Sequence, residues 1–299
     1  MRISIVFFSL LLFFGCSNSP KVKVETVPFT PPAIDSQTVG INLEDQTDTA
    51  GITKDLGIEF GFCNSKGDKV LLMSEDSLLK AAKFTKLVSY NYLLDDIKFV
   101  GRKKPTEQDN DRQTEYNFEN CGGYLYDLKN ETATPENSQV LLTENFLSNR
   151  KILPEIVEKY NTADLTKLKG ELRMRIEKDK GRKIKKSLRI RRTGEQEIYL
   201  VEFALKKDSA LAVLVYLNKS KFIYLDFSAK FDATSTWRVD DGGDFGMDYF
   251  KVLAVFECDG KIEIVTDWHG AEGVVTTYYR EENGKFVEVK TESRYTAPL

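Results

Sequence analysis

The sequence predicts a mainly β protein, built as an antiparallel meander with one or two short helices. From Ile58 onward, short apolar or alternating segments recur about every ten residues, with turn residues between them. Two of these turns contain Asp259-Gly260 and Asn283-Gly284, and Asn-Gly is the strongest short hairpin signal. This pattern predicts a sandwich, a barrel or a propeller-like arrangement, and no internal repeat selects among the three.

The N-terminal residues have the layout of an export signal. Arg2 supplies a positive charge, residues 3–14 are apolar apart from Ser4 and Ser9, and small Gly15 precedes Cys16. An apolar stretch of about a dozen residues is too short to cross a bilayer comfortably. Residues 1–15 are therefore predicted to be a signal peptide that is removed.

The end of this segment, Leu12-Phe13-Phe14-Gly15-Cys16, resembles the lipobox of bacterial lipoprotein signals. Phe13 and Phe14 depart from the family's preference for Leu followed by a small residue. The resemblance implies that Cys16 becomes the lipid-bearing first residue. Two or three acyl chains would anchor a protein stably to a membrane. In this class an Asp after the cysteine disfavours outer-membrane delivery, so Ser17 favours the outer membrane over the inner membrane of the bacterial envelope.

Residues 16–57 are predicted to be the lipidated N-terminus and a flexible tether. Pro20, Pro28, Pro31 and Pro32 lie there among many Thr, Ser, Asp and Gln residues, without sustained apolar periodicity. Such a segment buries too little apolar surface to offset the entropy of ordering its backbone. The mainly β domain is then expected to occupy residues 58–299.

The expected elements follow from the spacing of apolar residues and turns. A helix capped by Ser74 is predicted to reach Val88, and a second helix is predicted over residues 152–160. Strands are predicted over residues 69–73, 124–128, 140–143, 172–176, 184–192, 198–205, 211–217, 222–227, 250–257, 262–267, 274–280 and 286–289.

Positive charge is concentrated between Lys167 and Arg192, where thirteen Lys or Arg residues face three carboxylates. Strict alternation over residues 172–176 and a turn before residue 184 predict a hairpin with one basic face. That face would suit anionic headgroups, acidic glycans or phosphates, or it would simply protect the strands from edge pairing. Nucleic acid is not expected, because no aromatic residues interleave the charges. The predicted anion-binding residues are Arg173, Arg175, Lys185, Arg189 and Arg191.

An acidic, glycine-rich loop is a candidate metal site. Asp240, Asp241, Asp244 and Asp248 place four carboxylates within nine residues. Their oxygens could coordinate Ca²⁺, or paired aspartates could serve hydrolysis, or the loop could simply be solvated.

A second candidate for calcium is the hairpin over residues 256–265. Its Glu257, Asp259, Gly260 and Glu263 resemble in type the calcium loop of FG-GAP propeller repeats, although an Asp-Gly step of that loop is missing. The resemblance implies a propeller-like meander.

His269 is the one histidine of the chain, which restricts catalytic mechanisms. There is no G-x-S-x-G elbow and no His/Cys cluster with zinc spacing. Proton transfer by His269 with nearby Glu272 is conceivable, and the alternative is an ordinary turn histidine.

Three cysteines accompany Cys16, which fits one bridge and one free thiol in an oxidising compartment. The predicted bridge joins Cys63 and Cys121, both at strand ends beside turns, and leaves Cys258 free.

The sequence therefore predicts a lipid-anchored envelope lipoprotein that acts as a non-enzymatic binding or scaffolding module. Its partners would be an anionic headgroup, an acidic glycan or an envelope protein. The alternative is an envelope hydrolase that uses the loop Asp240–Asp248 or His269. An enzyme would lose activity on substitution of Asp or His, whereas a binder of anions would respond to salt and to Arg substitution.

Overall fold

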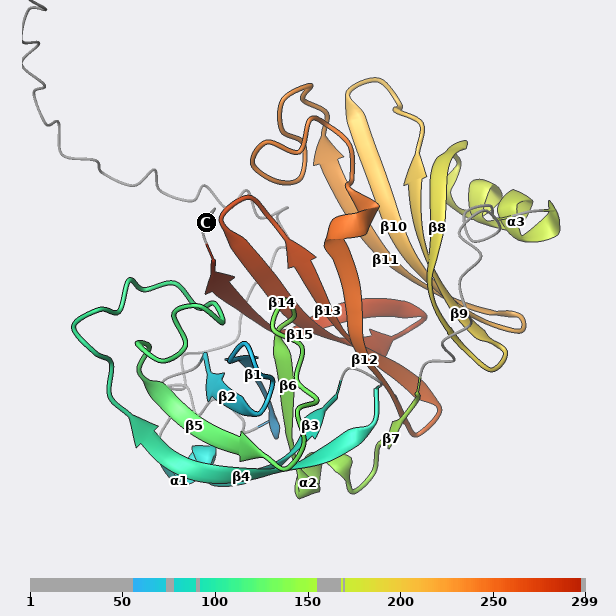
Figure 1. The fold of residues 1–299 in the computed structure, drawn as a ribbon. Helices are drawn as coiled ribbons and strands as arrows, with labels where there is room; N and C mark the ends of the chain where they lie inside the picture. The colour runs from blue at the N-terminus through green and yellow to red at the C-terminus, as the bar shows by residue number, and fades with distance from the viewer. Residues whose placement is uncertain (1–55, 74–77, 90–91, 155–167, 169, 297–299) are drawn as a thin grey trace, which may run out of the picture. The chain divides into compact units, whose positions relative to one another are not determined.

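Two antiparallel β structures make up the described part of the chain (Figure 1). The computed structural model describes residues 56–73, 78–89, 92–154, 168 and 170–296. The predicted signal peptide, Cys16, nearly all of the predicted tether and most of the predicted helix 152–160 lie outside these residues. Residues Thr53–Leu299 form one unit. No helix in the described ranges has both the length and the apolar character that crossing a membrane requires.

The first structure is a closed six-stranded barrel. Its strands neighbour one another in the order β1-β2-β5-β4-β3-β6, and β6 closes the circle by pairing with β1. The short helices α1 (Leu78–Ala81) and α2 (Glu144–Leu147) follow β2 and β6. The strands are β1 (Ile58–Cys63), β2 (Lys69–Leu72), β3 (Phe84–Val88), β4 (Leu94–Lys103), β5 (Gly123–Leu128) and β6 (Gln139–Thr143).

The barrel interior is filled by apolar side chains from alternate strand positions, as a small barrel requires. Tyr126 is fully buried in it, and its hydroxyl donates a 2.7 Å hydrogen bond to the carbonyl of Ala81. Every residue of β6 is buried. A strand that is buried on both sides has a continuous run of apolar residues, and this pattern predicts the strand over residues 140–143.

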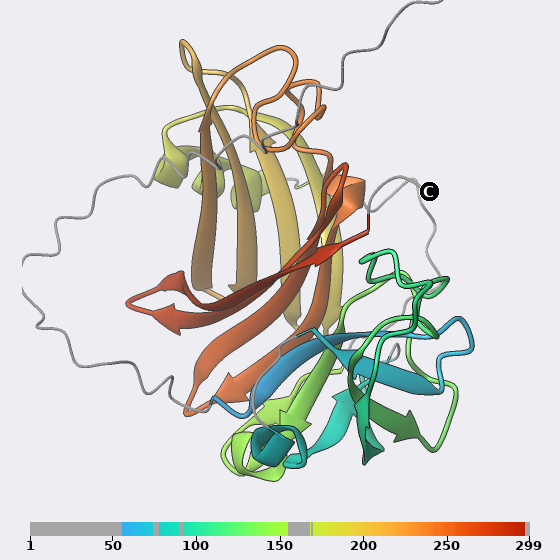
Figure 2. The same cartoon turned by 90° about the vertical axis from the view of Figure 1, so that its left-hand side faces the viewer.

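The second structure is a nine-stranded sheet, which Figure 2 shows strongly curved. Its order is β7-β12-β13-β14-β15-β11-β10-β9-β8, antiparallel throughout except for the contact of β11 with β15. The helix α3 (Gly170–Lys180) precedes β8. The strands are β7 (Lys151–Ile152), β8 (Ile184–Thr193), β9 (Gln196–Phe203), β10 (Ser209–Asn218), β11 (Lys221–Lys230), β12 (Phe250–Cys258), β13 (Lys261–His269), β14 (Gly273–Glu282) and β15 (Lys285–Tyr295).

Two of the hairpins of this sheet close through the predicted two-residue turns. Asp259 and Gly260 have φ values of 51° and 73° and join β12 to β13. Asn283 and Gly284 have φ values of 51° and 76° and join β14 to β15. Two consecutive positive φ values define the hairpin turn that matches the twist of the strands, which explains these residue pairs.

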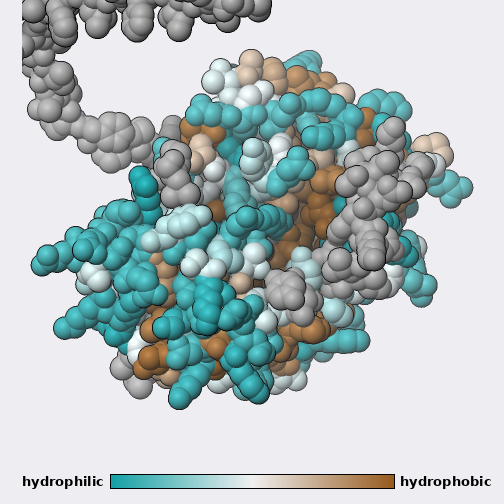
Figure 3. All heavy atoms as spheres, viewed as in Figure 1, coloured by the Kyte–Doolittle hydropathy of each residue, from teal (hydrophilic) through white to brown (hydrophobic). Residues whose placement is uncertain are grey.

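The barrel and the sheet share an apolar core. Phe60, Val140 and Phe146 of the barrel side pack with Phe256 and Tyr278 of the sheet. The rings of Phe146 and Phe256 lie 5.3 Å apart in an edge-to-face arrangement. On the face seen in Figure 3, side chains over the barrel are mostly hydrophilic, and hydrophobic side chains are seen over the sheet. The shared core ties the first and last thirds of the described chain together.

The structure confirms the mainly β fold with short helices, and a barrel is one of the three predicted architectures. One predicted hairpin is wrong, because residues 172–176 lie in α3. Glu, Leu, Arg, Met and Lys favour helix, and Arg173–Glu177 and Arg175–Asp179 form i,i+4 ion pairs there. The predicted helix 74–88 is also largely wrong, since β3 begins at Phe84.

Candidate functional site

The predicted hairpin with one basic face does not form, because residues 172–176, its predicted first strand, lie in the helix α3. On α3, Arg173 pairs with Glu177 at 3.1 Å and also donates to the carbonyl of Ile184. Arg175 pairs with Asp179 at 2.8 Å. Each of these two guanidiniums is thus compensated by a carboxylate one helical turn away.

The other three predicted anion-binding residues lie on β8 and also have partners. Lys185 forms ion pairs with Glu202 and Asp244, and Arg189 pairs with Glu197 at 2.7 Å. Arg191 is only 3% exposed, donates to the carbonyl of Leu153 at 2.6 Å and lies over the ring of Tyr92. Four of the five predicted residues are therefore paired with carboxylates of the domain, and Arg191 is buried.

The acidic loop is organised around one carboxylate rather than around a metal. Asp241 accepts backbone hydrogen bonds from Thr236, Trp237, Arg238 and Gly243 at 2.6–2.9 Å. Burial opposes ionisation of Asp241, but these four N–H groups outweigh it and lower its pKa below the usual value.

The remaining carboxylates of that loop point to other partners or to solvent. Asp244 pairs with Lys185, while Asp240 and Asp248 are exposed. The described ranges contain no group of three or more His, Cys, Asp or Glu residues that could hold a metal ion. Neither of the predicted calcium sites, including the one implied by Glu257, Asp259 and Glu263, thus brings three such ligands together in the described ranges.

The three described cysteines are free thiols, so the predicted bridge between Cys63 and Cys121 is not formed. Cys63 lies in the barrel core, whereas Cys121 accepts a 3.1 Å contact from the amide of Asn117 in the loop after β4. Burial raises the pKa of both thiols to about 12, which keeps them protonated.

His269 is half-buried at the end of β13 and does not form a catalytic pair. Burial lowers its pKa, which favours the neutral ring. Its Nε2 is buried without a hydrogen-bond partner in the described part of the chain. Glu272 is exposed, and no hydroxyl or thiol of the described residues is bonded to the ring. Nucleophilic catalysis requires such a contact between nucleophile and base.

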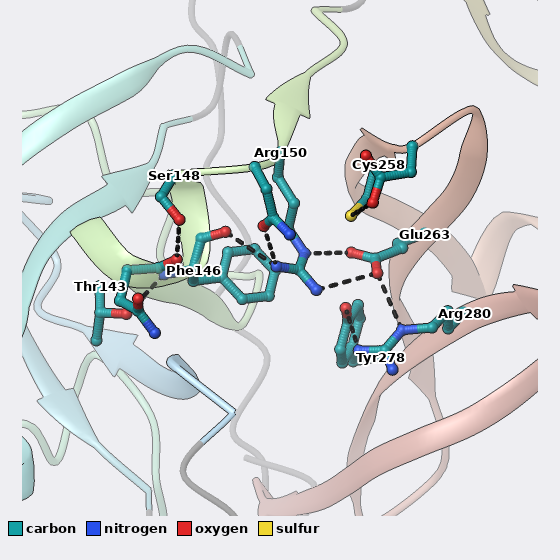
Figure 4. Close-up of polar contacts among 11 residues, drawn as sticks. Thr143, Phe146, Ser148, Arg150, Cys258, Glu263, Tyr278 and Arg280 are labelled. Carbon is teal, nitrogen blue, oxygen red and sulfur yellow. Dashed lines mark hydrogen bonds and ion pairs between the residues drawn. The ribbon is translucent and has the colours of Figure 1, made fainter.

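A convergence of buried and partly buried charged side chains lies where the barrel meets the sheet (Figure 4). We call it the two-arginine pocket. It has a volume of 430 Å³. Its lining residues are Leu56, Arg150, Cys258, Asp259, Lys261, Glu263 and Arg280.

Glu263 is the centre of this pocket. Its side chain is only 2% exposed, and Arg150 approaches it in a forked geometry, with Nε 2.6 Å from Oε2 and Nη2 3.2 Å from Oε1. Arg280 donates from Nε to the same Oε1 at 3.0 Å. One buried carboxylate therefore holds two guanidiniums, as the dashed lines of Figure 4 show.

Local structure fixes both arginines. Thr143 caps α2 by accepting a 3.1 Å hydrogen bond from the backbone N–H of Phe146. Arg150 then lies over the ring of Phe146, 4.1 Å from its centre, and donates to the Phe146 carbonyl at 3.0 Å. Arg280 lies directly across from Glu263 on neighbouring strands and donates to the hydroxyl of Tyr278. These contacts leave the guanidiniums little freedom before any ligand arrives.

The pocket keeps one uncompensated positive charge. Arg150, Lys261 and Arg280 line it against the two carboxylates of Asp259 and Glu263. Arg280 uses Nε and Nη2, and its Nη1 has no hydrogen-bond partner among the residues that the structure describes. With a side chain 34% exposed, Arg280 can reach a ligand.

The sequence did not indicate this pocket. Arg150 lies 113 residues from Glu263 in the sequence. Glu263 was considered only as a member of a calcium loop. The one usable signal was a carboxylate within an apolar strand, Ile262-Glu263-Ile264, because a buried carboxylate needs a cationic partner.

No protein-family model matches this chain, and no curated protein and no solved structure matches it significantly.

Proposed function

We propose that this chain is a lipid-anchored protein of the bacterial envelope that binds an anionic group without chemical turnover. The anchor is Cys16, and the binding site is the two-arginine pocket. The two-arginine pocket takes the place of the predicted basic hairpin as the anion-binding site, because the cations of the pocket are not fully neutralised.

The observation that carries the proposal is the free Nη1 of Arg280 beside a carboxylate already shared with Arg150. Two guanidiniums around one carboxylate retain a net charge of one, in a partly desolvated pocket where it is weakly screened. A charge-assisted hydrogen bond to such a group contributes about 1.5–3 kcal/mol.

The ligand chemistry that fits is an oxyanion, meaning a phosphate, sulfate or carboxylate group. Planar guanidinium groups match these ions better than ammonium groups do. In the envelope such a group is carried by anionic lipid headgroups and by acidic glycans. Either source would present the same oxyanion to Arg280 and Lys261.

The anchor is tested by fractionating cells that express the Cys16→Ala variant. The acyl chains on Cys16 would supply the membrane affinity, so the variant should leave the membrane fraction. Full-length wild-type protein should stay in that fraction at high salt. A variant that still sediments with membranes under those conditions would overturn the anchor.

The ligand class is tested with the full chain in non-ionic detergent, using inorganic phosphate and sulfate as probes against chloride at matched ionic strength. A ligand that binds the folded state raises the melting temperature in proportion to occupancy. We expect phosphate or sulfate to raise it and chloride not to do so. Equal melting curves in all three salts would overturn oxyanion binding.

A further inference from the structure

A second cleft, with a volume of 460 Å³, lies between the loop that follows β4 and the ends of β13, β14 and β15. The backbone N–H of Gln113 donates to the carbonyl of Tyr295, and the N–H of Tyr295 donates to the side-chain oxygen of Gln113. These bonds tie that loop to the end of β15, beside which it runs in Figure 1. We call this the tyrosine cleft, because Tyr116 and Tyr249 both line it together with Lys251, His269 and Arg294. It shares no lining residue with the two-arginine pocket.

The two tyrosines are unusually exposed for large aromatic side chains. Tyr116 is 70% exposed and Tyr249 is 57% exposed. The guanidinium of Arg238 lies 4.9 Å from the centre of the Tyr249 ring and also donates to the carbonyl of His269. The guanidinium of Arg238 thus covers one face of the Tyr249 ring. Exposed aromatic rings at a cleft are typical of ligand contacts.

One of the residues that line the cleft, Arg294, is a buried arginine. Arg294 is 3% exposed and donates to the carbonyls of Gln113 and Glu136 at 3.3 and 3.0 Å. It makes no ion pair within 4 Å with any described residue, and its Nε is buried without an acceptor there. The fully buried carboxylate of Asp267 compensates its charge only at longer range. Arg294 therefore fixes two loops of the cleft rather than serving a surface ion pair.

The polar groups of the cleft include both hydrogen-bond donors and acceptors. Glu115, Glu136 and Asp248 offer carboxylates, and Lys251 and His269 offer nitrogen atoms. Lys251 is oriented by a 2.8 Å hydrogen bond to Asn137. Three carboxylates disfavour a polyanion, and the charged lining disfavours a purely apolar ligand.

From this combination we infer that the tyrosine cleft binds a neutral, hydroxyl-rich pyranose sugar. A pyranose ring has apolar C–H faces, which pack on aromatic rings, and hydroxyl groups that donate to carboxylates and accept from ammonium groups. The cleft has a volume in the range of about 300–1,000 Å³ typical of small-ligand sites. This inference does not depend on oxyanion binding in the two-arginine pocket.

The test titrates maltose, cellobiose and chitobiose into the full chain in non-ionic detergent and follows binding by calorimetry. The Tyr116→Ala and Tyr249→Ala variants should each weaken binding roughly fivefold to tenfold, because each removes one stacking ring. The matched control is Tyr295→Ala, which changes an exposed tyrosine that does not line the cleft. It should bind as wild type does.

A second measurement locates the ligand without any substitution. Perturbation of the His269 ring resonances by the bound sugar is expected, because the ring lines the cleft. Two results would overturn the inference: no binding of any of the three neutral sugars, or binding that both tyrosine variants leave unchanged.

Discussion

The carboxylate of Glu263 on β13 accepts a 2.6 Å hydrogen bond from the guanidinium of Arg150, a residue 113 positions earlier in the chain. Arg150 follows the helix that ends the barrel, so this contact joins the barrel to the sheet. Because Arg280 binds the same carboxylate, the contact also creates the site at which we propose that an oxyanion binds.

Removal of the central carboxylate should strongly destabilise the fold. The Glu263→Leu variant would leave the guanidiniums of Arg150 and Arg280 without their shared partner. Breaking a buried pair in this way costs about 3–5 kcal/mol of unfolding free energy. Denaturant unfolding measures the loss. The matched control is Glu195→Gln, which breaks an exposed pair with Lys219 and should cost under about 1 kcal/mol. Equal losses in the two variants would show that Glu263 is not the centre of the contact.

Stability should fall as the pH rises from about 4.5 to about 7 through Glu59. Burial raises the pKa of Glu59 to about 7, and the nearby carboxylate of Glu292 raises it further. The ammonium group of Lys290 lowers the pKa but does not outweigh burial, and it is shared between the two carboxylates. The folded state therefore binds a proton more tightly than the unfolded state, and this stabilisation is lost as the pH passes the folded pKa. The Glu59→Gln variant should flatten this part of the profile of melting temperature against pH. An unchanged slope would contradict the raised pKa.

The acidic loop should depend on Asp241 and not on calcium. The Asp241→Ala variant loses an acceptor of four backbone hydrogen bonds and should lose about 1–3 kcal/mol of stability. Asp240→Asn, at the exposed neighbour whose positive φ of 60° Asn also tolerates, should stay within about 0.5 kcal/mol of wild type. Melting curves in EDTA and in millimolar calcium should coincide. A rise in melting temperature with calcium would restore the metal site.

The thiols should differ in reactivity according to burial. Cys258 is partly exposed and should be alkylated in the native protein. Cys63 and Cys121 are buried with raised pKa values, so they should react only after unfolding. Peptide mapping without reductant distinguishes this from a bridge. A Cys63–Cys121 disulfide peptide would contradict the free thiols.

Most strands could be predicted because the spacing of apolar residues and turns is a local property of the sequence. The hairpin turns at Asp259-Gly260 and Asn283-Gly284 are set by two residues each, and the neighbouring apolar runs fix the register. The sequence did not predict β4, because only Ile97 of this strand is buried and charged residues interrupt its apolar pattern. The strand predicted over residues 172–176 is wrong, because five alternating positions are too few to outweigh helix propensity and i,i+4 ion pairs.

Closure and the binding sites could not be predicted in the same way. The barrel closes through the pairing of β1 with β6, and β11 meets β15 in parallel, both between strands distant in the chain. The two-arginine pocket likewise depends on Arg150 and Glu263 meeting across the barrel and the sheet. Where partners lie so far apart in the sequence, local residue patterns do not reveal which charges meet.

The most direct measurement of the central claim compares sulfate binding to wild type, Arg280→Gln and Arg175→Gln by calorimetry at low ionic strength. Arg280 belongs to the two-arginine pocket, whereas Arg175 belongs to the predicted basic face and is compensated by Asp179. In Arg280→Gln, Arg150 still pairs with Glu263, so the fold should persist. We predict that Arg280→Gln abolishes sulfate binding and that Arg175→Gln leaves it unchanged. The reverse result, or wild-type affinity in both variants, would contradict the proposed site.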